Sequence, residues 1–193
     1  MPAPQEKLIL ASRSPRRREL LTAAGYRFEV CPPSESAESG SCPGESPAEL
    51  VARLAYQKAA DVVPHIESGW VLACDTVAEC DGQILGKPVD RQHAREMLLM
   101  LCGREHRVLT GLCLWKAPDG DAAVRVAVTT LRMDRLSDEQ LEEYLASGGW
   151  KGKAGAFGYQ DRLGWVHVIE GSQSNVVGLP MELLAEMLWS GNA

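Results

Sequence analysis

The sequence is poor in the residues that hold zinc. Four histidines occur in 193 residues, and none of the six cysteines forms a Cys-x-x-Cys pair. A structural zinc site needs several such ligands at characteristic spacings. We therefore expect no zinc site in this chain.

Long hydrophobic runs are also missing. No segment reaches the roughly 18 consecutive apolar residues that a membrane-spanning helix requires. The first seven residues lack the apolar stretch of a secretory signal peptide. These absences predict a cytoplasmic protein with reduced thiols and no membrane partner.

Basic residues are outnumbered, with 20 Lys and Arg against 26 Asp and Glu, and the net charge is −6. Because nucleic-acid binding relies on a basic surface, no nucleic-acid partner is expected. Hydrophobic residues make up 45% of the chain and charged residues 24%, as in ordinary globular proteins. The length, without repeats or low-complexity linkers, predicts one domain over residues 1–193.

The segment 7–21 combines a buried strand with a basic turn. Residues 8–11 are apolar and uncharged, as in a strand buried on both faces. Ser12 and Ser14 follow, then Pro15 and three arginines at 16–18, which predicts a helix capped by Ser14. Backbone N–H groups at a helix N-terminus favour an anion, and guanidinium groups grip phosphate. The alternative is a solvated basic turn.

A second candidate site follows the apolar run 70–74. Asp75 and Thr76 come directly after it, and a carboxylate at the end of a buried strand is typical of α/β active sites. Residues 77–80 extend or re-form the strand, and Asp81-Gly82 predicts a hairpin that returns Lys87 toward Asp75. Singly, Asp75 could be a turn residue and Lys87 a surface cation.

Two further segments carry polar residues that could reach a ligand. A helix begins at Ser46, and Glu49 three residues later predicts a capping box with it. Lys58 borders the apolar face of this helix, where it could extend to water or into a cleft. Residues 151–160 are glycine-rich with two lysines but do not form a Walker A loop. Gln160 could read a base edge through its amide.

The loop 34–47 is rich in Ser, Glu, Gly and Pro. Its glutamates at 35, 38 and 45 could offer a carboxylate to a metal, although a solvated acidic loop is the favoured interpretation. The remaining elements are predicted to be scaffold: helices at 16–24, 90–103, 137–147 and 181–188, strands at 26–31, 107–115, 122–133 and 165–169, and a turn at 170–175.

Several segments together resemble the Maf family of nucleoside triphosphate pyrophosphatases. They occur in the family's order and span residues 8 to about 188, so the set is far more specific than any one motif. The matching segments are residues 10–17, 74–76, 81–82 with 85–88, 153–160, and 175–180.

The resemblance implies an α/β fold of Maf/ITPase-like type, with a long twisted mixed sheet flanked by helices, two lobes and a central cleft. It implies a cytoplasmic hydrolase acting on acid anhydrides, a nucleotide diphosphatase, which splits a nucleoside triphosphate into the monophosphate and pyrophosphate. A divalent cation, Mg²⁺ or Mn²⁺, and a homodimer are also implied.

By the same resemblance, Asp75 corresponds to the catalytic proton acceptor, acting with Lys87 and Glu38. Asp75 and Glu38 are the expected metal ligands, although Glu35 competes with Glu38 in the alignment, and Asp75 could be base, ligand or both. Residues matching substrate choice are Arg16, Thr76 and Gln160, and those lining the pocket are Ser12, Ser14, Arg17, Lys58, Lys87 and Lys153.

Arg16, Thr76 and Gln160 are similar to the members that act on dTTP and UTP, and on modified pyrimidine nucleotides. Members that prefer 7-methyl-GTP carry a tryptophan before the second arginine, Asp-Gln and Ser-Glu-Gly instead. The chain departs from the family pattern at Asp161, where glycine is usual, and at Cys74, where a small residue is usual. The alternatives are a 7-methyl-GTP pyrophosphatase, or a non-catalytic nucleotide-binding regulator or interaction protein of cell division.

Overall fold

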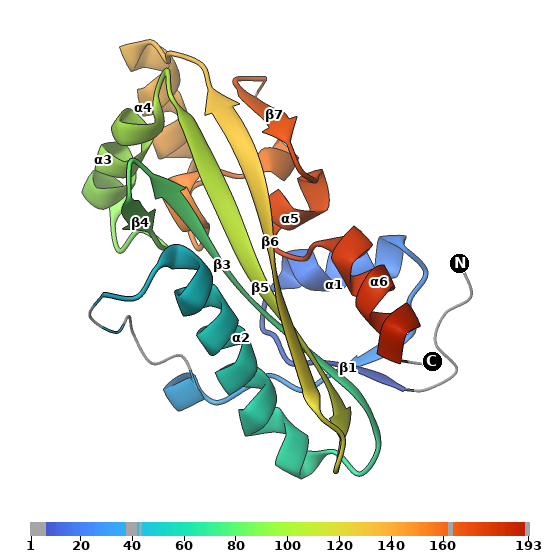
Figure 1. Ribbon diagram of the computed structural model, residues 1–193. Helices are drawn as coiled ribbons and strands as arrows, with labels where there is room; N and C mark the ends of the chain where they lie inside the picture. The colour runs from blue at the N-terminus through green and yellow to red at the C-terminus, as the bar shows by residue number, and fades with distance from the viewer. Residues whose placement is uncertain (1–6, 38–41, 43, 162–163, 192–193) are drawn as a thin grey trace.

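The computed structural model describes residues 7–37, 42, 44–161 and 164–191. Its centre is a mixed sheet in the order β2-β1-β3-β5-β6-β7, with β4 paired to β3 (Figure 1). The strands are β1 Leu8–Leu10, β2 Phe28–Val30, β3 Gly69–Cys80, β4 Gln83–Leu85, β5 Glu105–Ala117, β6 Ala122–Met133 and β7 Val166–Glu170.

The sheet combines a parallel edge with an antiparallel centre. β1 pairs in parallel with both β2 and β3, whereas β3, β5 and β6 form a long antiparallel meander. All three residues of β1 are buried, as the uncharged run predicted. Alternate residues serve opposite faces, because Leu8 and Leu10 belong to one core cluster and Ile9 to another.

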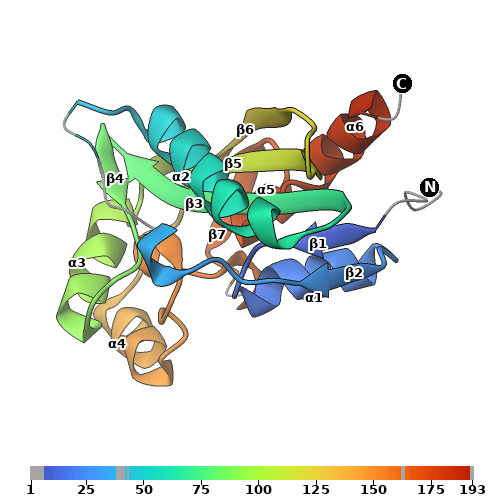
Figure 2. The ribbon, with the colours of Figure 1, turned by 90° about the horizontal axis from the view of Figure 1, so that it is seen from below.

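Helices cover both faces of the sheet and one of its ends (Figure 2). Small side chains of α2 pack with Ile9 on one face, whereas α1 and α6 pack with Leu8 and Leu10 on the other. α3 and α4 join a separate cluster at the far end. The α-helices are α1 Pro15–Ala23, α2 Pro47–Val62, α3 Arg91–Leu101, α4 Asp138–Ser147, α5 Gln173–Val177 and α6 Met181–Gly191, and the 3₁₀ turns are η1 Glu35–Ala37, η2 Val63–His65, η3 Ala154–Ala156 and η4 Tyr159–Asp161. This is the α/β fold that the sequence predicted.

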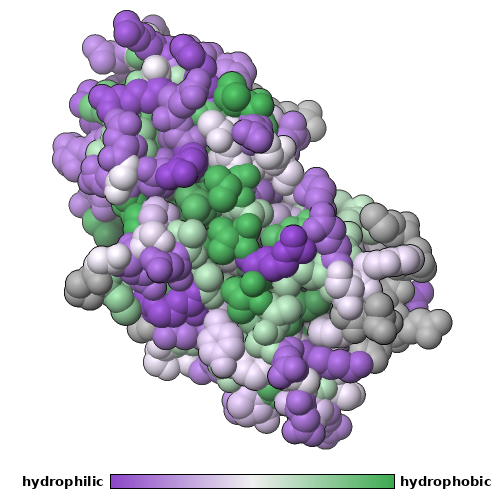
Figure 3. Space-filling model, in the orientation of Figure 1, coloured by the Kyte–Doolittle hydropathy of each residue, from purple (hydrophilic) through white to green (hydrophobic). Residues whose placement is uncertain are grey.

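α2 lies unusually close to the sheet because Gly111 of β5 has no side chain. A Cβ at Gly111 would overlap the carbonyl of Val51 and come within 2.8 Å of the Ala52 nitrogen. Ala55 and Ala59 continue the small contact surface. Figure 3 shows hydrophobic residues gathered along the middle of the visible surface, between more hydrophilic ends. The close packing fixes where the distal turns of α2 meet β3.

Two details of the sequence predictions change in the structure. Asp75 does not lie at the end of its strand, because Asp75 and Thr76 stay paired with Gly111 and Thr110 of β5, and of the two alternatives for residues 77–80 the structure confirms that they extend the strand. The predicted turn over residues 170–175 contains the start of α5. Ser172 caps that short helix by accepting a hydrogen bond from the Asn175 nitrogen at 3.2 Å. Among the described residues, no helix has both the length and the apolar character to cross a membrane.

Candidate active site

A cleft opens where β3 loses its neighbours on one edge. β1 pairs with β3 only as far as Leu72, and Ala11 adds one more hydrogen bond to that residue at 2.8 Å. β4 joins the same edge only from Ala78 onward. Among the described strands, residues 73–77 are therefore paired on the β5 side alone, and a cleft of about 420 Å³ lies beside them.

The turn between β1 and α1 forms one wall of the cleft. Ser14 occupies the predicted N-cap position, but its side chain makes no capping hydrogen bond. Instead its backbone nitrogen donates to the Ser12 hydroxyl at 3.1 Å. The Arg17 guanidinium donates to the same hydroxyl at 3.1 Å and to the Gly178 carbonyl at 2.7 Å. Ser12 and Arg17 thus join the turn to the segment that precedes α6.

Asp75 lies in the cleft against an ammonium group from α2. Lys58 Nζ donates to Asp75 Oδ1 at 2.6 Å, and the two side chains are 5% and 16% exposed respectively. The sequence left open whether Lys58 extends to water or into a cleft, and in the structure it extends into the cleft. The pair fixes one carboxylate oxygen, while no described residue donates to Oδ2.

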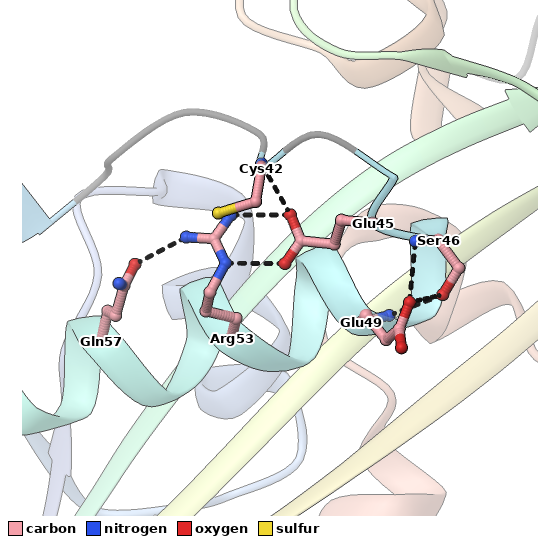
Figure 4. A network of polar contacts seen from close by, with 6 residues as sticks. All are labelled: Cys42, Glu45, Ser46, Glu49, Arg53 and Gln57. Atoms are coloured by element: carbon pink, nitrogen blue, oxygen red, sulfur yellow. Dashed lines mark hydrogen bonds and ion pairs between the residues drawn. The ribbon is translucent and has the colours of Figure 1, made fainter.

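The N-terminal end of α2 is anchored by a polar network (Figure 4). The Arg53 guanidinium makes a two-pronged ion pair with Glu45, at 2.7 and 2.8 Å, and also donates to Gln57 at 3.1 Å. Ser46 and Glu49 form the capping box that the sequence predicted. The hydrogen bonds from Arg53, followed by that from the Cys42 nitrogen, lower the pKa of Glu45 to about 2 against the effect of burial. The network holds the helix that presents Lys58.

Thr76 lies on the opposite face of β3 from Asp75 and belongs to a buried polar network. Its hydroxyl lies 2.9 Å from that of Thr110 and accepts a hydrogen bond from Arg17 at 3.2 Å. The Asn175 amide donates to the Val108 carbonyl at 3.1 Å and to the Thr129 hydroxyl at 2.9 Å. The sequence analysis did not single out Thr110, Thr129 or Asn175, although a threonine within an otherwise apolar strand can indicate a buried hydrogen bond.

The glycine-rich segment forms the opposite wall. Arg16 donates to the Gly152 carbonyl at 2.8 Å, and the Gly155 nitrogen donates to the Gly86 carbonyl at 3.1 Å, next to Lys87. Lys153 forms an ion pair with Asp161. Burial, followed by the neighbouring charge of Arg17, lowers the pKa of Arg16.

The cleft collects most of the predicted site residues. Gln160 lies in η4, where only its backbone is described, and Glu38 lies outside the described residues. Glu35 belongs to η1 and is not among the described residues that line the cleft. The predicted residues that line it are Ser12, Ser14, Arg16, Arg17, Lys58, Asp75, Thr76, Lys87 and Lys153.

Comparison with known proteins identifies this arrangement. A family model described as "Maf-like protein" matches residues 7–190. The chain belongs to the Maf family. The predicted resemblance is thereby confirmed, and the cleft is that of a Maf protein.

Curated relatives support the same grouping. A protein named dTTP/UTP pyrophosphatase from Rhodopirellula baltica is 61% identical over 184 residues, covering 95% of this chain and 81% of its own. A protein of the same name from Geobacter sulfurreducens is 40% identical, covering 91% of each chain. A solved structure of a nucleoside-triphosphatase, or dITP/XTP pyrophosphatase, from Mycobacterium abscessus aligns with a TM-score of 0.42 and 16% identity, covering 67% of this chain and 75% of that one.

The cleft of this Maf protein is strongly cationic, although the whole chain is acidic. Its described lining holds seven basic side chains and one carboxylate, that of Asp75. The basic residues are Arg13, Arg16, Arg17, Lys58, Lys87, Lys151 and Lys153. Such a cluster suits a ligand that carries several negative charges close together.

The donor set of the cleft fits one kind of metal ion. Within the described ranges, no group of three or more His, Cys, Asp or Glu residues could hold a metal. A Mg²⁺ ion bound together with a nucleotide needs fewer protein ligands, because it uses one or two carboxylates, the phosphates of the substrate and several waters. Asp75 Oδ2 supplies a suitable oxygen. The site therefore fits an ion that arrives with a phosphate ligand and does not fit one held by described protein groups alone.

Proposed function

We propose that this Maf protein hydrolyses dTTP and UTP, and modified pyrimidine nucleotides, to the monophosphate and pyrophosphate. The observation that carries the proposal is the placement of Asp75, held by Lys58, as the single described carboxylate among seven basic side chains. The names of the curated relatives supply the nucleotide. The activity is that of a nucleotide diphosphatase.

Binding would start at the turn between β1 and α1. Ser12 and Thr76 each take one N–H from a terminal nitrogen of Arg17, which leaves a second N–H on each nitrogen for a phosphate oxygen. Lys58, Lys87 and Lys153 would neutralise charge on the departing pyrophosphate. Reactions at phosphorus depend mainly on such positioning and charge stabilisation.

Asp75 would act on the attacking water. Its Oδ2 would accept a proton as the water oxygen forms a bond to the α-phosphorus and the bond to the bridging oxygen of the β-phosphate breaks. Lys58 fixes the carboxylate through Oδ1, so Oδ2 keeps one orientation. General-base assistance of this kind contributes about 10²–10⁴-fold to a rate.

In the alternative role of Asp75 as a metal ligand, its carboxylate would hold a Mg²⁺ or Mn²⁺ ion, with Glu38 as the second candidate ligand, and the ion would neutralise charge on the phosphate oxygens. Arg16, Thr76 and Gln160 are the proposed determinants of base choice. A polar site that pairs with base-edge groups rejects a mismatched base better than an apolar slot does. We also propose a single cytoplasmic domain that works as a homodimer on free nucleotides.

A substrate panel tests the proposal. Purified protein with Mg²⁺ or Mn²⁺ is incubated with dTTP, UTP, CTP, GTP and 7-methyl-GTP, and monophosphate and pyrophosphate are quantified separately. We expect the highest kcat/KM with dTTP and UTP and equal amounts of the two products. Preference for 7-methyl-GTP would overturn the nucleotide assignment alone, whereas release of orthophosphate, or no turnover, would overturn the reaction itself.

A further inference from the structure

One lysine of the cleft, Lys153, is already paired with a carboxylate of the same glycine-rich segment. Lys153 lines the cleft, and its ammonium group forms an ion pair with Asp161, eight residues further along. The two side chains are only 12% and 25% exposed. Partial burial makes such a pair stronger than a surface salt bridge, because solvent screens it less.

The local backbone is shaped around this pair. Lys153 precedes η3, Asp161 ends η4, and Gly158 lies between the two turns. A Cβ at Gly158 would come within 2.6 Å of the Asp161 carboxylate and closer still to the Lys153 ammonium. The pair therefore fills the space that the absent side chain leaves.

We propose that Asp161 is an internal counter-ion that competes with the phosphates of the ligand for Lys153 and so sets the affinity of the cleft for triphosphate and pyrophosphate. The inference rests on the proposed function for its choice of ligands. The carboxylate offsets the positive charge of Lys153, so a phosphate oxygen has to compete with it for that ammonium group.

The exchange leaves Asp161 with other partners. The Tyr144 hydroxyl donates to Asp161 Oδ2 at 3.4 Å, and the positive charge of Arg16 interacts with the same carboxylate. Asp161 therefore keeps a hydrogen-bond donor and a nearby positive charge when Lys153 turns to a ligand. After the reaction, Lys153 can return to Asp161 as pyrophosphate leaves, which weakens product binding.

The variant Asp161→Asn tests the inference. We expect the KM for dTTP and the inhibition constant of pyrophosphate to fall together by about threefold to tenfold, because both ligands use the freed lysine. Asp161→Glu keeps the charge and should restore values within about twofold of the original. Asp119→Asn makes the same charge change on an exposed turn and should alter neither constant. Unchanged or increased constants in Asp161→Asn would overturn the inference.

A double-mutant cycle shows whether Asp161 acts through Lys153. In a Lys153→Met background, Asp161→Asn should no longer change either constant. A fall of similar size in that background would overturn the counter-ion role. Calorimetric titration of the same four proteins with pyrophosphate needs no turnover, so the inference can fail or hold independently of the proposed reaction.

Discussion

Asp75 differs from the other acidic residues of the same hairpin, Glu79 and Asp81, because it is the one that lines the described part of the cleft. Lys58 reaches it from α2 at 2.6 Å. Asp81, at the hairpin turn, makes an exposed pair with Arg104 at 2.8 Å. The two aspartates therefore provide a matched comparison between a cleft carboxylate and a surface one.

Replacing Asp75 by Asn should remove most turnover while preserving the fold. The amide keeps an oxygen for Lys58 but cannot accept the proton of the attacking water, so we expect kcat to fall by about 10²–10⁴-fold. Steady-state assays with dTTP measure this, and circular dichroism checks the fold. Asp81→Asn should retain full activity, whereas near-normal turnover in Asp75→Asn would remove Asp75 from the chemistry.

Cys74, immediately before Asp75, is chemically quiet despite its position. Its side chain is fully buried, and burial raises the pKa of the thiol to about 11, against the opposing charges of Arg17 and Lys58. With this pKa, Cys74 stays protonated near neutral pH. A protonated thiol is unreactive, because the thiolate is the reactive form. The burial of Cys74 and the raised pKa of its thiol both oppose its oxidation.

At the scale of elements, the position of Lys58 depends on how α2 is held at its start. Glu45 carries a pKa of about 2, below the value of about 4.3 expected in an unfolded chain, chiefly because of its hydrogen bonds from Arg53. A carboxylate whose folded pKa is depressed stabilises the fold above the unfolded pKa. That contribution is lost as pH falls through the folded value.

Glu45→Gln should therefore lower the urea midpoint at pH 7, and the difference from the unaltered protein should shrink as pH falls from about 5 to 2. Urea titrations across this pH range measure the effect. Glu67→Gln, an exposed change between η2 and β3, is the control and should leave the midpoint unaltered. A difference that grows toward low pH would contradict the assigned role of the Glu45–Arg53 pair.

The sequence predicts some elements of the fold and of the candidate site better than others. The apolar run of β1, the capping box of α2 and the Asp81-Gly82 hairpin depend on neighbouring residues, and the structure confirms all three. The open edge of β3 depends on where β1 and β4 stop pairing, which no local pattern encodes. The hydrogen bonds of Arg17 to Gly178 and Thr76 join segments more than 50 residues apart. The sequence therefore predicted a phosphate ligand near Arg17 but not the residues that hold the Arg17 guanidinium in place.

At the scale of the whole molecule, the cleft gathers basic groups from distant parts of the chain. Lys58 comes from α2, Arg17 from α1, Lys87 from the segment after β4 and Lys153 from the glycine-rich wall. Their mutual repulsion is a cost that an anionic ligand would relieve. An anion bound there would also link the core cluster containing α3 and α4 to the clusters around α1 and α2.

Pyrophosphate should consequently stabilise the protein against heat, even without turnover. A ligand at 100 times its Kd adds about 2.7 kcal/mol, which for a chain of this length raises Tm by about 5–10 °C. Differential scanning calorimetry with pyrophosphate, against sodium sulfate at equal ionic strength, measures the specific part of the effect. In Lys87→Met the shift should shrink, because one of the bridging cations is gone. Equal shifts with sulfate and pyrophosphate would mean that the seven basic groups act as a general anion site and do not recognise linked phosphates.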